Sequence, residues 1–291
     1  MNDRVRAEPL RAPGSNPGQP VRRLEGLPIL MYHSISPTAA PGFARFAMHP
    51  GDFAAHMAFI ADAGYQAITI SEAMALQDRR QQLPERAVVL TFDDGFDDFH
   101  TTALPILREY RLRATLYVTT GYVGRTGRWL ADCDEQDRVM IGWSQLREAA
   151  AEGVEIGAHS HTHPQLDRLE ATRLADEIRR PKALLEDRLG VAVKSFAYPF
   201  GYWDRTTRRA VAKAGYDSAC GVDDLPARTG RSRLALPRLT VDAGTSVEQL
   251  RQLLLIRPSR AGVAAVPVRR VLWRTLRRSS HVHPQWRDPR S

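Results

Sequence analysis

Residues 87–118, AVVLTFDDGFDDFHTTALPILREYRLRATLYV, contain the pattern that decides the fold. This stretch begins with an apolar strand at 87–92 and ends with another at 113–118, and a helical pattern at 101–110 lies between them. Two strands that alternate with a helix form a βαβ unit, in which the strands run parallel. The stretch therefore predicts a parallel sheet covered by helices.

The same alternation continues on both sides of this unit. Further strands are predicted at 27–33, 66–70, 154–159, 193–200, 217–222 and 234–241. Further helices are predicted at 49–65, 71–80, 143–153, 170–189 and 203–216. About seven parallel strands are too many for a small open sheet and favour an α/β barrel. In such a barrel the reactive residues lie at the C-terminal ends of the strands.

The composition indicates a globular protein with one large domain or two small ones. Of its 291 residues, 43% are hydrophobic, which is enough to fill a core. No apolar run approaches the ~18 residues of a membrane span. The N-terminal segment lacks the apolar region of a secretory signal, so we predict a cytoplasmic protein. Cys133 and Cys220 lack metal-type spacing and are predicted to be unpaired thiols.

The two ends of the chain differ from the rest in composition. Residues 1–24 predict a disordered leader, residues 25–258 the barrel, and residues 259–291 a basic tail. Residues 257–291 contain nine arginines and one aspartate, a net charge of +8. This equals the formal net charge of the whole chain, so the remaining residues are balanced. The balanced charge elsewhere argues against a nucleic-acid partner. Residues 266–280 form a basic amphipathic pattern that can bind an anionic membrane, although a solvated or docked tail fits equally well.

Polar side chains follow four of the predicted strands. His33 ends the first strand, Asp93 and Asp94 follow the strand at 87–92, and residues 159–163 and 198–201 follow two later strands. A parallel barrel brings the C-terminal ends of its strands to one rim. We therefore expect these residues to form one site.

Three histidines occur within five residues in GAHSHTHP, residues 157–164. If the strand continued, His159, His161 and His163 would share one face; if a helical turn began after His159, only His159 and His163 would converge. Either arrangement offers two imidazoles to one ion, although solvated histidines also fit this fragment taken alone. Two histidines with one carboxylate are typical of a catalytic zinc site or a related divalent site.

The carboxylate for such an ion is expected from the aspartate pair. Adjacent residues of a regular strand point to opposite faces, so Asp93 and Asp94 enter one pocket only if the chain turns, as Gly95 allows. One aspartate would then bind the ion while the other acts as a base, and the ion would keep both ionised. Asp97 and Asp98 are expected to cap the following helix.

TFDDG, HSHTH and FAYPFG, in this order and at strand ends, resemble motifs of the polysaccharide deacetylase family. These are the family 4 carbohydrate esterases, which have the NodB-homology domain, and the resemblance covers about residues 27–241. It implies a distorted (β/α) barrel. It also implies a hydrolase that removes N-acetyl groups from amino sugars of a polysaccharide or glycan precursor, with Zn²⁺ or another divalent ion such as Co²⁺ or Ni²⁺.

The resemblance also implies roles for individual residues. Asp93 matches the catalytic base of the family, and its metal ligands correspond to Asp94, His159 and His163. His161 falls at a variable position. The substrate implied for this site is an N-acetylated glycan.

The sequence departs from the family motifs at two points. Ala197 occupies the position of an arginine that orients the catalytic aspartate, and no late Leu-x-His motif with a general-acid histidine is evident in 234–241. His33 resembles the N-terminal histidine that serves as the acid in poly-N-acetylglucosamine deacetylases. Arg238 is a candidate for the missing arginine. The alternatives are a structural, hydrogen-bonding histidine and an arginine in a surface ion pair.

The third motif supplies the expected substrate contacts. Tyr198, Pro199 and Phe200 are predicted to bind the substrate, and an N–H near Tyr198 is predicted to hold the oxyanion. Trp129 is one of several aromatic residues near strand ends that could stack on a sugar, although core packing is the commoner role. Two other functions fit the same motifs: a metal amidase acting on a non-sugar amide, and a barrel that binds glycans without catalysis.

Overall fold

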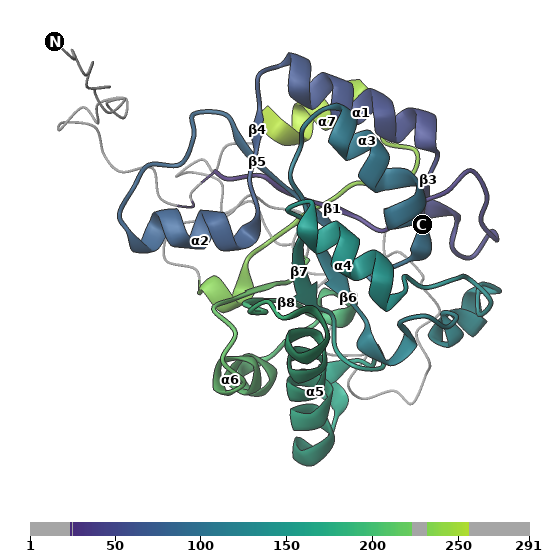
Figure 1. Ribbon diagram of the computed structural model, residues 1–291, viewed down its shortest axis with the longest axis vertical. Coiled ribbons are helices and arrows are strands. Elements are labelled where there is room, and N and C mark those ends of the chain that lie inside the picture. Colours follow the sequence, from purple (N-terminus) through teal and green to yellow (C-terminus); the bar gives the residue numbers. More distant parts are fainter. Residues whose placement is uncertain (1–23, 25, 223–231, 256–291) are drawn as a thin grey trace, which may run out of the picture.

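The computed structural model describes Leu24, residues 26–222 and residues 232–255 (Figure 1). Within these ranges the main sheet is parallel throughout, in the order β10-β1-β5-β6-β7-β8-β9, and β4 pairs with the start of β5. Its strands are β1 (Ile29–Tyr32), β4 (Gln66–Ala67), β5 (Ala87–Phe92), β6 (Thr115–Val118), β7 (Glu155–Ala158), β8 (Ser195–Ala197), β9 (Ser218–Cys220) and β10 (Leu239–Thr240). A small second sheet joins β2 (Ser34–Ile35) to β3 (Ala47–Met48). Except for Leu24, the predicted leader at 1–24 lies outside the described residues, as does the predicted tail at 259–291.

The two ends of the main sheet approach each other. A parallel bridge joins Cys220, at the end of β9, to Leu236, which shortly precedes β10. The Gly221 N–H also donates to the Leu236 carbonyl, at 2.8 Å. The sheet is therefore curled into a distorted barrel, as the sequence predicted.

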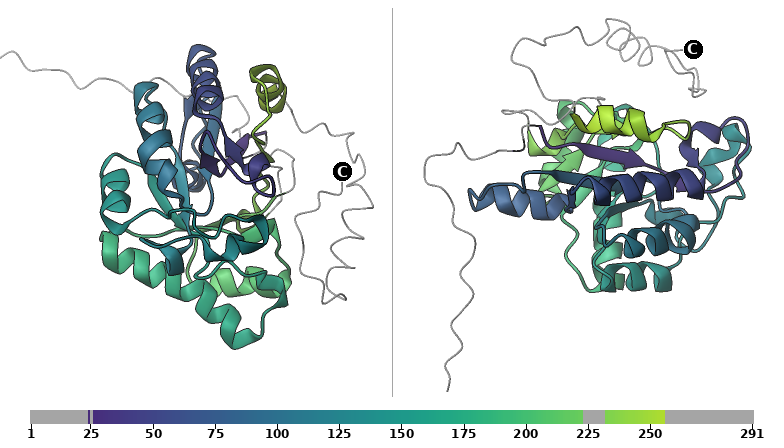
Figure 2. Two further views of the ribbon diagram at one scale, coloured as in Figure 1. Left: turned by 90° about the vertical axis from the view of Figure 1, so that its right-hand side faces the viewer. Right: turned by 90° about the horizontal axis from the view of Figure 1, so that it is seen from above.

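Helices lie on the outside of the curled sheet (Figures 1 and 2). They are α1 (Pro50–Asp62), α2 (Ile70–Asp78), α3 (Leu104–Glu109), α4 (Trp143–Ala151), α5 (Ala171–Leu189), α6 (Arg205–Lys213) and α7 (Val247–Leu255). The amphipathic pattern of α5 explains its position, since its buried Leu174, Ile178 and Leu185 recur at helical spacing. The sequence did not predict α7, which packs near α1.

Strand β5 is the centre of the fold. It pairs with β1 over four residues, from Ile29 opposite Val89 to Tyr32 opposite Phe92, and with β6 on its other side. All six of its residues are buried, as expected of a parallel strand covered on both faces. Because β1 and β5 are in register, their C-terminal ends lie at the same level, and the chain leaves both strands at one rim.

Several predicted strands are shorter in the structure, and the local reason is clear for two of them. The strand predicted at 66–70 is reduced to the two residues of β4, because Thr69 and Glu72 form a capping box that begins α2. The strand predicted at 234–241 begins as a 3₁₀ turn, Arg233–Ala235, and only Leu239–Thr240 pairs with β1.

The capping role predicted for Asp97 and Asp98 is wrong. Asp98 precedes the π-helical turn Phe99–Ala103 that leads into α3, but its carboxylate makes no capping hydrogen bond. It accepts instead from the Ser34 hydroxyl, and Asp97 accepts from the Gln145 amide. Both partners are distant in sequence, so local spacing could not have indicated them.

The described residues also bear on the predictions for the two cysteines and for membrane-spanning segments. Cys133 and Cys220 are free and buried, which confirms the prediction of unpaired thiols. Among the described helices, none combines the length and the apolar character needed to cross a membrane.

Candidate metal and active site

The chain turns sharply where β5 ends. Asp94 and Gly95 both have left-handed backbone conformations, with φ of 75° and 81°. Hydrogen bonds hold the turn, since the Gly95 N–H donates to the Asp93 carbonyl at 3.0 Å and the Thr119 N–H donates to the Asp94 carbonyl at 3.1 Å. The predicted turn is present, but it begins at Asp94, where a non-glycine residue adopts an uncommon conformation.

Asp94 and two histidines converge beyond this turn. Oδ1 of Asp94 lies 3.3 Å from Nε2 of His159 and 3.2 Å from Nε2 of His163. One donor atom from each of the three residues lies within 4.8 Å of the others, and all three residues are buried. Nδ1 of His159 lies 2.9 Å from the Ala197 carbonyl, so Nδ1 carries the proton and Nε2 is left to act as a ligand.

This donor set fits a divalent ion. Asp94 Oδ1 is buried and has no hydrogen bond of acceptable geometry among the described residues. A buried carboxylate oxygen left in this way is costly unless a cation satisfies it. Two imidazoles and one carboxylate form a ligand set that zinc accepts in catalytic sites, with a position left for water or substrate. Burial opposes the ionisation of Asp94, but the two histidines outweigh it and lower the pKa of the carboxyl far below its usual range.

The loop between the two histidine ligands turns His161 away from them. Ser160 and His163 have positive φ, of 63° and 60°, so the chain is neither a continued strand nor a regular helix. Nδ1 of His161 lies 2.9 Å from the Thr120 hydroxyl. Of the two geometries considered from the sequence, only convergence of His159 and His163 occurs.

A buried carboxylate on α5 holds this loop. Glu177 accepts hydrogen bonds from the His161 N–H at 2.9 Å and the Thr162 N–H at 2.8 Å, and also from the Thr162 hydroxyl. It is only 4% exposed. Glu177 belongs to none of the sequence motifs, but its place between Leu174 and Ile178, on the buried face of an amphipathic helix, is a signal that the sequence does carry.

Glu177→Leu is expected to weaken metal binding by about 10–100-fold, because two buried N–H groups lose their acceptor and the loop that carries His163 is released. Zinc affinity, measured by competition with a chelator, checks this expectation. Glu186→Leu is the matched control, since Glu186 also lies on α5 and accepts from a backbone N–H, that of Val193. Equal zinc affinity in both variants would contradict a role for Glu177 in holding the ligand loop.

Arg238 clamps the other aspartate of the pair. Its two terminal nitrogens donate to Oδ1 and Oδ2 of Asp93, each at 2.6 Å, and its Nε donates to the Gly221 carbonyl at 3.1 Å. Arg238 is fully buried, so the alternative of a surface ion pair is wrong. Burial raises the pKa of Asp93, but the charge of Arg238, with those of His159 and His33, outweighs burial and leaves the pKa lowered.

The two aspartates therefore have different surroundings. Both oxygens of Asp93 are held by Arg238, and its Oδ2 lies 3.9 Å from Nε2 of His159. Oδ1 of Asp94 lies nearer to His159, at 3.3 Å, and 3.2 Å from His163, and among the described residues no arginine pairs with this carboxylate. This geometry favours Asp94 as the metal ligand and leaves Asp93 beside the ion as an ionised carboxylate.

His33 follows β1 directly and is half-buried at the same rim. Its ring packs against that of Phe46, with centroids 4.8 Å apart. Burial lowers the pKa of His33, and the nearby charges of Asp94 and Asp93 act in the opposite direction. Among the described residues no hydrogen bond holds the His33 ring, so the alternative of a structural, hydrogen-bonding histidine has no support in the structure.

The residues of the FAYPFG motif are more deeply buried than predicted. Tyr198 is fully buried, its hydroxyl donates to the Leu234 carbonyl at 2.9 Å, and its N–H donates to the Cys220 carbonyl at 3.0 Å. Neither of these two groups is left for a substrate, so the structure does not support Tyr198 as a substrate contact, and the N–H predicted to hold the oxyanion would have to belong to a neighbour of Tyr198. Pro199 is buried as well, and only Phe200 of the three is half-buried at the rim.

Two aromatic side chains pack against His163, one of the three candidate ligands. The ring of Phe200 lies 4.7 Å from that of His163, and Trp129 stacks on His163 at 5.3 Å. Trp129 is half-buried, and its indole Nε1 is buried without a hydrogen-bond partner among the described residues. The site thus has an apolar wall with one unused donor.

The chain is similar to known deacetylases over most of this barrel. A family model described as polysaccharide deacetylase matches residues 80–219. A Bacillus subtilis protein named for this family, YxkH, is 29% identical over 220 residues, which are 76% of this chain and 73% of the relative. A poly-beta-1,6-N-acetyl-D-glucosamine N-deacetylase from Staphylococcus aureus is 24% identical over 173 residues, which are 56% of this chain and 57% of that protein. The structure of the Streptococcus pyogenes deacetylase PplD in complex with acetate is similar at a TM-score of 0.68 and 26% identity, covering 78% of this chain and 97% of that chain.

The family match does not reach every residue of the site. It includes the aspartate pair and both histidine ligands, whereas His33 precedes it and Arg238 follows it. The structure brings both outlying residues to the matched site, Arg238 by direct contact with Asp93 and His33 by its place at the end of β1.

Proposed function

Because the chain belongs to the polysaccharide deacetylase family, we propose that it is a zinc-dependent hydrolase that removes N-acetyl groups from a glycan containing N-acetylglucosamine. One observation carries this proposal: the ligand set of Asp94, His159 and His163 lies beside an ionised Asp93 that Arg238 holds in place. Metal-assisted hydrolysis of an amide uses an ion and a base side by side. The staphylococcal relative, named for its action on poly-N-acetylglucosamine, supports the substrate class.

The residues of the rim divide the chemistry among them. A zinc ion held by Asp94, His159 and His163 would polarise the acetyl carbonyl and lower the pKa of a water molecule. Asp93 accepts the proton of the attacking water, and its lowered pKa keeps it ionised for this role. His33 donates a proton to the leaving amine.

The aromatic wall suits a sugar ring. The partly exposed side chains of Trp129 and Phe200 lie next to His163, where their apolar surface can pack against a sugar ring. Phe200 is thus retained from the predicted substrate contacts, and Trp129 replaces Tyr198 and Pro199.

Acetate release tests the proposal. Zinc-loaded protein is expected to release acetate from β-1,6- and β-1,4-linked N-acetylglucosamine oligomers, and Asp93→Asn is the inactive control. Binding of oligomers without acetate release would indicate a glycan-binding barrel instead. Release from simple N-acetyl amides but from no sugar would indicate an amidase, and either result would overturn the proposal.

A further inference from the structure

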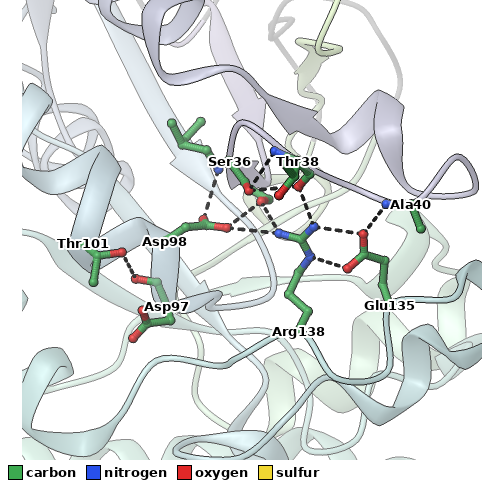
Figure 3. Close-up of polar contacts among 10 residues, drawn as sticks. Ser36, Thr38, Ala40, Asp97, Asp98, Thr101, Glu135 and Arg138 are labelled. Atoms are coloured by element: carbon green, nitrogen blue, oxygen red, sulfur yellow. Dashed lines mark hydrogen bonds and ion pairs between the residues drawn. The ribbon is translucent and has the colours of Figure 1, made fainter.

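Arg138 lies at the centre of a polar cluster on the rim, outside the metal site (Figure 3). Its Nε and one terminal nitrogen donate to the two carboxylate oxygens of Glu135, at 3.1 and 3.0 Å. Its other contacts are with the Ser34 hydroxyl at 2.9 Å, the Thr38 carbonyl at 3.2 Å and Asp98 at 3.4 Å. All five N–H groups of the guanidinium can therefore be satisfied, which a lysine with one nitrogen cannot reproduce.

This cluster joins three segments that are distant in sequence. Arg138 and Glu135 belong to the loop before α4, Asp98 follows β5, and residues 34–40 follow β1. Both carboxylates also bind the backbone of that last segment, since Asp98 accepts from the Ile35 N–H at 3.0 Å and Glu135 accepts from the Ala40 N–H at 2.5 Å. Residues 34–40 are thus fixed at both ends by groups that Arg138 holds.

The cluster is also sheltered. The side chains of Arg138 and Glu135 are 10% and 12% exposed. The guanidinium lies over the rings of Phe43 and Phe96, 4.9 and 5.7 Å from their centroids. An ion pair shielded in this way restrains its neighbours more strongly than an exposed pair on the surface.

The segment that this cluster fixes begins immediately after His33. No hydrogen bond holds the His33 ring within the described part of the chain, and its packing partner Phe46 also contacts Phe43, which lies beneath Arg138. The orientation of His33 therefore depends on Ser34 and Ile35 on one side and on the Phe43–Phe46 pair on the other. Arg138 contacts Ser34 and Phe43 directly.

We propose that Arg138 is a positioning residue that holds His33 in place for proton donation at the neighbouring metal site. This proposal rests on the proposed function. Arg138 itself has no contact with the metal ligands in the described structure, and it acts through the segment that carries His33.

A double-mutant cycle between Arg138→Lys and His33→Ala tests the proposal. Arg138→Lys is expected to lower the turnover number for acetate release by about 10²-fold, because a proton donor displaced by about 1 Å loses its alignment. His33→Ala is expected to lower turnover without releasing zinc. In the His33→Ala background, Arg138→Lys is expected to change turnover by no more than about two-fold, because its effect passes through His33. Zinc content is expected to be unchanged in all variants.

Two further variants keep the outcome clear. Arg108→Lys is the control, because Arg108 pairs with Glu152 on the outside of the barrel. This substitution is expected to leave turnover unchanged. Ser34→Ala removes a single link between Arg138 and the segment after His33, and it is expected to lower turnover in the same direction if Arg138→Lys fails to fold. The proposal would be overturned if Arg138→Lys and Ser34→Ala both had wild-type turnover. It would also be overturned if Arg138→Lys lowered turnover by the same factor in the protein with native His33 and in the His33→Ala variant. Wild-type protein that releases no acetate would overturn the proposed function, and this inference with it.

Discussion

Asparagine in place of Asp93 is expected to lower the rate of acetate release by about 10²–10⁴-fold while zinc stays bound. The amide has nearly the shape of the carboxylate but cannot accept the proton of the attacking water. Zinc should remain because its three proposed ligands are Asp94, His159 and His163, and Asp93 is held instead by Arg238. Zinc content after dialysis and turnover in excess zinc are the two measurements.

Asp94→Asn is the matched variant, with the same chemical change one residue away. It removes the anionic ligand from a set whose other members are neutral imidazoles, so zinc is expected to be lost on dialysis. Loss of zinc from Asp93→Asn and its retention by Asp94→Asn would mean that the two roles are reversed. High activity in both variants would exclude the proposed mechanism.

The sequence predicted the strands and the ligand set because both depend on local patterns. Strand β5 matches its predicted range, 87–92, since a run of buried β-branched and apolar residues is distinctive. The proposed metal ligands follow strand ends, and a parallel barrel brings those ends together whatever the details of packing. His33 was predicted as a polar residue at the end of its strand, whereas Arg238 was predicted only as a candidate for the arginine that the third motif lacks.

The failures involve contacts between segments distant in sequence. Asp98 was expected to cap a helix, but donors from residues 34 and 35 and from Arg138 bind it more completely than the local backbone would. Tyr198 was expected at the substrate surface, but its hydroxyl is turned inward to Leu234. No local pattern distinguishes a solvated carboxylate or phenol from one with a distant partner.

The two residues that the sequence motifs did not reveal also act through contacts between distant segments. Glu177 and Arg138 both lie outside the recognised motifs, and each binds backbone groups of a loop that carries a proposed site residue. Their effect depends on which loops the barrel brings together. The motif residues can therefore be identified before the fold is known, whereas the partners of Glu177 and Arg138 are seen only in the folded chain.

Arg238→Met is expected to lower the free energy of unfolding of the metal-free protein by about 3–5 kcal/mol, because it leaves the buried carboxylate of Asp93 without its cation. Methionine fills much of the same space, so the lost ion pair dominates the change. Adding Asp93→Asn to Arg238→Met removes the stranded charge and is expected to restore part of the stability. A double variant less stable than Arg238→Met alone would contradict this account.

The same substitution is expected to move the pH dependence of both stability and activity. In the native chain the pKa of Asp93 is below its unfolded value, so the ion pair stabilises the fold above the unfolded pKa and the contribution is lost as pH falls through the folded pKa. Without Arg238, burial raises the pKa of Asp93, so the deficit in unfolding free energy should be largest near neutral pH and shrink on acidification. Because the proposed base Asp93 can accept a proton only when it is ionised, the acid limb of the kcat/KM profile should move to higher pH in Arg238→Met. An acid limb at the same pH in both proteins would mean that Arg238 does not control the ionisation of the catalytic base.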